Sequence, residues 1–166
     1  MIALHDFNHL PHDQALALIH PCVALPCWAD ALVHGRPYAS RDELFSTAKS
    51  LMQNWDEAAL AQALSAHPRI GEKPAGSAAE AALSRQEQGA VNDRDAALAR
   101  ALREGNARYE ARFGRVFLIR AKGRSGEEIL QALHARLENS DAQEIHAALE
   151  QLREITLLRL EGVIHE

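Results

Sequence analysis

A histidine at position 67 stands next to the chain's richest concentration of glycine and proline. Pro68 follows it directly, and the segment 69–76 is rich in both residue types. Because proline disfavours helical geometry in the residue before it, a helix that begins near residue 56 must end at or before His67. An imidazole at a helix end can reach a bound substrate and exchange a proton with it near neutral pH. The commoner alternative is a histidine that hydrogen-bonds the last carbonyl groups of its own helix.

A second group of polar side chains follows at Ser84, Glu87 and Gln88. In a helix these positions are three and four residues apart and share one face, so a hydroxyl, a carboxylate and an amide would converge on one small ligand. Such a set could hold a hydantoin-like or urea-like molecule. The alternative is a solvated helix face or a capping box, because Ser-x-x-Glu is also the capping-box pattern. From these residues alone, the alternative is favoured.

Three histidines near the N-terminus, His5, His9 and His12, have spacings that would suit metal ligands on one helix. Pro11 and the turn-like residues 6–8 interrupt the face that these ligands would need, so no metal site is expected here. The sequence also lacks the H-E-x-x-H, G-x-S-x-G, phosphate-loop and dinucleotide-binding motifs. The usual hydrolase and nucleotide-enzyme signatures are therefore missing.

The composition indicates one helical domain. The length of 166 residues fits a single domain spanning 1–166, and 47% hydrophobic with 25% charged residues is ordinary for a soluble globular protein. Aromatic residues make up only 5% while Ala and Leu are abundant, which favours helices over sheets. The composition thus predicts an all-α fold.

Charge and hydropathy exclude several partners. A net charge of −5 gives no long-range attraction for nucleic acid. Neither a signal peptide nor an apolar run of membrane-spanning length is evident, so the sequence predicts a cytoplasmic protein without a membrane partner. Cys22 and Cys27 fit neither a disulfide framework nor a zinc knuckle.

Start and stop signals predict where the helices lie. Pro11 can open a first helix that ends before Pro21, and Ser40 and Ser125 each begin a capping box. The predicted helical or apolar segments are 11–20, 25–33, 40–54, 56–67, 77–90, 93–113, 125–139 and from 140 onward. The apolar run 116–119 is expected to be a buried connector rather than a strand, for want of partner strands.

An ordered series of motifs resembles the OHCU decarboxylase family over nearly the whole chain. These enzymes convert 2-oxo-4-hydroxy-4-carboxy-5-ureidoimidazoline (OHCU) to (S)-allantoin, the last step from urate. Each motif is weak alone, but the ordered set is specific. The motifs are Phe7-Asn8, Cys22 to Pro26 with Trp28, His67-Pro68-Arg69-Ile70-Gly71, Ser84 to Gln88, Tyr109 to Gly114 with the run 116–119, and Glu154-Ile155 followed by Arg159-Leu160.

The resemblance implies an all-α, single-domain bundle of about eight helices, usually a homodimer, that needs neither a metal nor an organic cofactor. His67 would match the catalytic histidine of the family, and Glu87 its partner acid. The substrate-binding positions would be matched by Pro68, Ser84, Gln88, the backbone around Ile119, and Arg159 as a further contact. The loop 120–126 is more basic and glycine-rich than expected, which leaves its role open.

The chemistry of the implied substrate suits these residues. Its carboxylate sits on a carbon that also bears a hydroxyl, beside an imine-like carbon that can accept the electrons released with carbon dioxide. We hypothesise that His67 donates a proton to one face, that Glu87 orients and polarises the hydroxyl, and that Ser84 with Gln88 reads the amides. Two rivals remain: a helical module that binds a ureide without transforming it, and a metal-dependent ureide hydrolase that uses the three N-terminal histidines.

Overall fold

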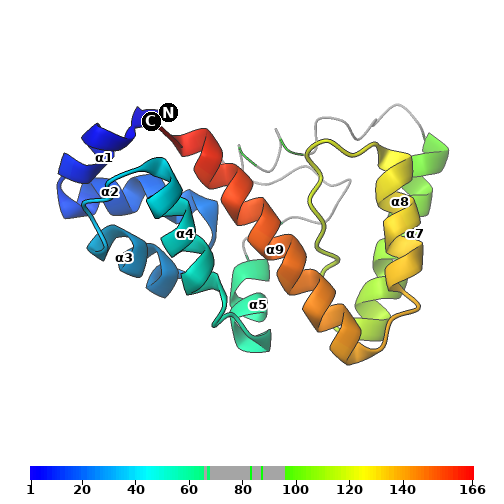
Figure 1. The fold of residues 1–166 in the computed structure, drawn as a ribbon. Coiled ribbons are helices and arrows are strands. Elements are labelled where there is room, and N and C mark those ends of the chain that lie inside the picture. The colour runs from blue at the N-terminus through cyan, green and yellow to red at the C-terminus, as the bar shows by residue number, and fades with distance from the viewer. Residues whose placement is uncertain (66, 68–82, 84–86, 88–95) are drawn as a thin grey trace. The chain divides into compact units, whose positions relative to one another are not determined.

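The structure is a computed structural model that describes residues 1–65, 67, 83, 87 and 96–166. Within these ranges the chain forms eight α-helices and one short 3-10 helix, so the prediction of an all-α fold is confirmed (Figure 1). Two strands of two residues each are the exception. The elements are β1 (Ile2–Ala3), α1 (Leu4–His9), α2 (His12–Ile19), η1 (His20–Cys22), α3 (Pro26–His34), α4 (Arg41–Met52), α5 (Glu57–Leu64), α7 (Ala96–Phe113), α8 (Gly126–Arg136), α9 (Asp141–Val163) and β2 (Ile164–His165).

The chain divides into two compact units. The first unit comprises Met1–Ala63 and Arg153–Glu166, and the second comprises Leu64–Leu152. Helix α9 contributes its first part to the second unit and its last part to the first. The single-domain organisation inferred from the length stays a prediction. None of the helices in the described ranges combines the length and the apolar character that crossing a membrane requires.

Local signals position most helices of the first unit as the sequence predicts. Pro11 is the N-cap of α2, and α3 begins at Pro26. The hydroxyl of Ser40 accepts the Glu43 N–H at the start of α4, while the Glu43 carboxylate accepts the Ala39 N–H instead of completing the capping box at Ser40. The predicted helix starts are thus confirmed, with one capping contact displaced by a residue.

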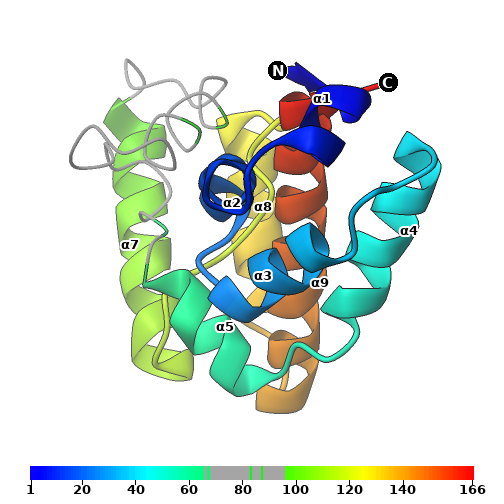
Figure 2. The same cartoon turned by 90° about the vertical axis from the view of Figure 1, so that its left-hand side faces the viewer.

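Two features of the first unit contradict the sequence interpretation. Residues 6–8 are helical in α1 rather than turn-like, because Leu4 and Phe7 lie three residues apart and both are buried. The chain ends also form a parallel pair, β1 with β2, that joins Ile2 to Ile164. Figures 1 and 2 show the two termini side by side. Neither strand is long enough to carry a sequence pattern of its own.

The second unit is built on the packing of α7 against α8. Ser125 and Glu128 form the complete capping box that the sequence predicts for the start of α8. The connector, residues 116–121, forms neither helix nor strand, and Phe117, Leu118 and Ile119 on it are buried, as predicted. Its side chains join one apolar cluster, made of Leu98, Leu102, Tyr109, Phe113, Phe117, Ile119, Ala121, Ile129, Leu133 and Leu137.

A glycine in the middle of α7 is required by this packing. A Cβ built on Gly105 would lie 2.4 Å from Cδ2 of Leu133, whose side chain is fully buried. Gly105→Ala is therefore expected to lower the free energy of unfolding by about 1–2 kcal/mol, because overpacking outweighs the gain in helix propensity of about 1 kcal/mol. Urea denaturation at 25 °C measures the change.

Gly162, near the end of α9, is the matched control. It is exposed, and a Cβ there would meet no atom within 4 Å. Gly162→Ala is expected to raise the free energy of unfolding by up to about 1 kcal/mol through helix propensity alone. Stabilisation by both substitutions would contradict the role of Gly105 in the contact between α7 and α8.

Candidate functional site

His67 lies just beyond the end of α5. The helix ends at Leu64, and the backbone N–H of His67 donates to the Leu64 carbonyl over 3.1 Å. The predicted stop of this helix at or before His67 is thus confirmed. The histidine as a whole is half-buried, and the Nε2 atom of its imidazole is itself buried. Such a position suits a group that must exchange protons with a small molecule.

Glu87 is helical and half-buried, and Leu83, four residues before it, is also helical. These two positions agree with the helix predicted over residues 77–90. The remaining predicted site residues of this region, Pro68, Ser84 and Gln88, lie outside the described residues, as does the glycine- and proline-rich loop 69–76.

Ile119 lies on the connector in the second unit, with 5% of its surface exposed. Its side chain belongs to the apolar cluster between α7 and α8, so only its backbone is suited to polar recognition. The expectation that the backbone around Ile119 contacts the substrate stays a prediction.

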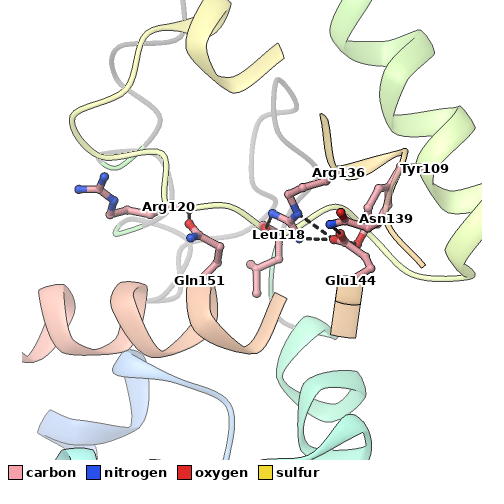
Figure 3. A network of polar contacts seen from close by, with 7 residues as sticks. All are labelled: Tyr109, Leu118, Arg120, Arg136, Asn139, Glu144 and Gln151. Atoms are coloured by element: carbon pink, nitrogen blue, oxygen red, sulfur yellow. Dashed lines mark hydrogen bonds and ion pairs between the residues drawn. The ribbon is translucent and has the colours of Figure 1, made fainter. Parts of the chain in front are cut away.

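A polar network that the sequence did not indicate lies at the base of the connector (Figure 3). Its centre is Glu144 on α9, which is completely buried. Arg136 donates to the Glu144 Oε1 atom from Nε, over 2.8 Å, and from Nη2. The Tyr109 hydroxyl donates to the same oxygen over 2.6 Å, and Asn139 donates to Oε2 over 3.0 Å. The buried charge therefore has one cationic and two neutral donors, which offset its desolvation.

The tyrosine of this network stays protonated. Burial raises the pKa of the Tyr109 hydroxyl above its ordinary value, and the hydrogen bond and negative charge of Glu144 raise it further. Tyr109 is thus a fixed donor at neutral pH. The sequence offered only one signal for this network, because Tyr109 stands in one of the family motifs while Arg136 and Glu144 read as charges on amphipathic helices.

Arg159 belongs to the first unit. Only 3% of its surface is exposed, and its Nη1 atom donates to the carbonyls of Pro21 and Cys22 over 3.2 and 3.5 Å. A charged side chain buried to this degree serves a specific contact rather than solubility. The contacts link α9 to the segment around η1, which also carries one of the family motifs. Whether Arg159 contacts substrate stays a prediction.

The three N-terminal histidines do not come together. His5 and His9 face each other on α1, with ring centroids 4.5 Å apart, whereas His12 belongs to α2 and pairs with His34. In the ranges that the structure describes, no three histidine, cysteine, aspartate or glutamate side chains are grouped to hold a metal. The break between the helices falls at Leu10, not at residues 6–8 as the sequence suggested.

The basic loop 120–126 owes part of its composition to structure. Arg124 donates from Nε to the Arg120 carbonyl over 2.8 Å, and Gly123 has a φ of +82°, which disfavours any residue with a side chain. A Cβ on Gly126 would lie 2.5 Å from Cδ2 of Leu98. These contacts explain one arginine and two glycines of the loop without a ligand.

The model of one protein family, described as OHCU decarboxylase, matches residues 8–161 of the chain. The chain belongs to the OHCU decarboxylase family. The motifs quoted from the sequence all lie within the matched range except Phe7. His67, Glu87, Ile119 and Arg159 lie within the matched range and among the residues that the structure describes.

Two decarboxylases are similar to this chain over most of their length, and a bifunctional protein is similar over about a third of its length. A 2-oxo-4-hydroxy-4-carboxy-5-ureidoimidazoline decarboxylase of Amia calva is 33% identical over 146 residues, which are 87% of this chain and 81% of the relative. The enzyme of the same name in Haloferax volcanii is 27% identical over 160 residues, 96% and 94% of the two chains. In the uric acid degradation bifunctional protein TTL of Arabidopsis thaliana, 37% identity extends over 128 residues, 74% of this chain and 37% of that protein.

Solved structures agree with the family assignment. A crystal structure of OHCU decarboxylase in the presence of (S)-allantoin superposes with a TM-score of 0.72 at 27% identity, covering 88% of this chain and 96% of that one. A crystal structure of (S)-allantoin synthase has a TM-score of 0.73 at 20% identity and covers 99% of this chain and 54% of that one. At that identity the second comparison supports the fold alone.

Proposed function

We propose that this member of the OHCU decarboxylase family converts OHCU to (S)-allantoin in urate degradation, without a metal or an organic cofactor. The observation that carries the proposal is the family match over residues 8–161, which includes His67, three residues after the end of α5 at Leu64. We further propose a homodimer, as the family resemblance implies, and a cytoplasmic location, as the sequence predicts.

The reaction needs only acid-base groups because the substrate contains its own electron sink. The bond between the ring carbon and the carboxylate breaks, carbon dioxide leaves, and the electron pair moves toward the neighbouring C=N group. The hydroxyl on the same carbon then loses its proton as a carbonyl forms. The neighbouring ring carbon gains one proton, and the ring nitrogen of the former C=N group gains another, so one net proton comes from solvent. Two positioned groups can perform these proton transfers, one on the hydroxyl and one on a single face of the ring.

In this proposal Glu87 polarises and deprotonates the hydroxyl, and His67 delivers the proton to the ring carbon. The half-buried positions of both residues permit contact with a small molecule. Pro68, Ser84 and Gln88 are proposed as substrate-binding residues, with the Ser84 hydroxyl and the Gln88 amide binding the ureido and ring amides of the substrate. The Ile119 backbone and the Arg159 guanidinium are proposed as further substrate contacts.

The wild-type protein, added to freshly oxidised urate, is expected to release carbon dioxide and to give optically active allantoin. Spontaneous decay of the intermediate yields the racemate, because water delivers the proton to both faces. Circular dichroism records the handedness of the product, and the rate is expected to survive treatment with excess EDTA.

The same experiment distinguishes the rivals. A module that only binds the ureide would show saturable binding with no release of carbon dioxide, and a metal-dependent hydrolase would lose its activity on chelation. Either result contradicts the proposed function, and so does a racemic product at the spontaneous rate.

A further inference from the structure

Two side chains hold the connector on either side of Ile119 (Figure 3). Arg136 donates from Nη1 to the Leu118 carbonyl oxygen. Gln151 accepts at Oε1 from the Arg120 N–H over 2.9 Å. The connector is neither helix nor strand, so regular secondary structure does not fix these backbone groups. The two side chains therefore supply the hydrogen bonds that a helix or a sheet would provide elsewhere.

The guanidinium of Arg136 is itself fixed. Two of its nitrogens contact Glu144, and its Cζ atom lies 4.5 Å from the ring centroid of Phe117. A buried ion pair adds little stability compared with apolar residues of the same volume, so stability alone gives weak reason for this pair. What the pair does secure is the direction of the guanidinium, and with it the position of the Leu118 carbonyl.

This arrangement leaves the backbone N–H and C=O groups of Ile119 available to bind a ligand. Within the described part of the chain, neither the N–H nor the C=O of Ile119 makes a hydrogen bond, although only 5% of the residue's surface is exposed. In an extended chain, adjacent residues present their polar groups to opposite sides. Because Arg136 and Gln151 bind the groups of Leu118 and Arg120, we expect the groups of Ile119 to face the other way.

We propose that Arg136 and Gln151 are positioning residues that set the Ile119 backbone to bind an amide edge of the substrate. A urea or a cyclic amide presents an N–H beside a C=O, and the C=O and N–H of one extended residue match that edge. The inference rests on the proposed function, and it adds two residues that act through the backbone rather than by touching the substrate.

Gln151→Met tests the inference most directly, because methionine has a similar length but is only a weak acceptor for the Arg120 N–H. The KM for the ureidoimidazoline is expected to rise about tenfold, with kcat changed by less than about threefold, since the lost contact binds substrate and transition state alike. Gln151→Glu retains an acceptor oxygen and is expected to recover most of the lost affinity. Arg136→Lys, which keeps the charge beside Glu144 but not the guanidinium fork, is expected to raise KM in the same way.

Gly105→Ala is the stability-matched control, because it disturbs the packing of α7 on α8 without touching the connector's hydrogen bonds. Its KM is expected to equal that of the wild type. Amide hydrogen exchange gives a second readout that needs no activity: Gln151→Met is expected to speed exchange of the Arg120 N–H about tenfold.

The outcomes separate the two proposals. If the wild type is active and Gln151→Met leaves KM unchanged, the positioning role is overturned and the decarboxylase function stands. The same conclusion follows if Gly105→Ala raises KM as much as Gln151→Met does. A KM that rises equally in Gln151→Glu and Gln151→Met would also overturn the positioning role. A wild-type protein that releases no carbon dioxide would overturn both, whatever the exchange rates show.

Discussion

Replacing His67 with asparagine is expected to lower kcat for (S)-allantoin formation by about two to four orders of magnitude, the usual contribution of a positioned general acid. Asparagine can occupy the space at the end of α5 and can form hydrogen bonds, but it cannot transfer a proton near neutral pH. The hydrogen bond from the backbone N–H of residue 67 to Leu64 does not depend on the side chain, so the helix end should persist. Initial rates of carbon dioxide release and of the circular dichroism signal measure the loss.

Glu87→Gln separates the two proposed roles. The amide still orients the hydroxyl by a hydrogen bond but cannot accept its proton, so kcat is expected to fall by about two orders of magnitude. Any allantoin formed should remain one-handed, because His67 still protonates one face. With His67→Asn, in contrast, the residual product should approach the racemate.

His146 provides the matched histidine control. It lies on α9 with 77% of its side chain exposed, and no catalytic or binding role is proposed for it. His146→Asn is expected to keep the wild-type rate and the wild-type free energy of unfolding. Near-native turnover in His67→Asn would refute the proton-donor role, and a racemic product from Glu87→Gln would reverse the assignment of the two groups.

The sequence predicted features whose causes are local. Pro11, Ser125 and the His67-Pro68 pair each act through the geometry of their immediate neighbours, and α2, α8 and the end of α5 lie where these residues require. The connector was also predicted as buried because its run of apolar residues has no polar alternation. Local signals therefore placed His67 at a helix end and Ile119 on a buried connector, whereas their expected roles in the candidate site came from the family resemblance.

Features that depend on distant residues could not be predicted. The parallel pair of β1 with β2 joins Ile2 to Ile164, and two-residue strands have no periodicity to detect. Glu144 is completely buried, yet in the sequence it is one of several acidic residues on a helix. Its burial follows from Tyr109 and Arg136, which reach it from other helices. Contacts of this kind decide which charge is structural, and single-sequence patterns do not contain them.

Phe117→Ala is expected to lower the free energy of unfolding by about 3–5 kcal/mol, the largest effect on stability predicted for this chain. Only 1% of Phe117 is exposed. Its ring forms a T-shaped pair with the Tyr109 ring, with 5.2 Å between the ring centroids, and the Arg136 guanidinium lies over the Phe117 ring. Truncation therefore leaves a cavity and removes two specific contacts. Urea unfolding at 25 °C measures the change, and Phe117→Leu, with a smaller expected loss of about 1–2 kcal/mol, serves if the alanine variant does not fold.

Phe45 on α4 is the matched phenylalanine. It also has an arginine over its ring, with Cζ of Arg41 4.6 Å from the centroid, but it is only half-buried. Phe45→Ala is expected to lower the free energy of unfolding by no more than about 1.5 kcal/mol, because folding buries less apolar surface at Phe45 than at Phe117. Equal losses at the two positions would show that the cation over the ring, rather than burial in the apolar cluster, anchors Phe117. Phe117→Leu, which removes the ring under the Arg136 guanidinium, should then free that guanidinium to move and raise KM as strongly as Gln151→Met.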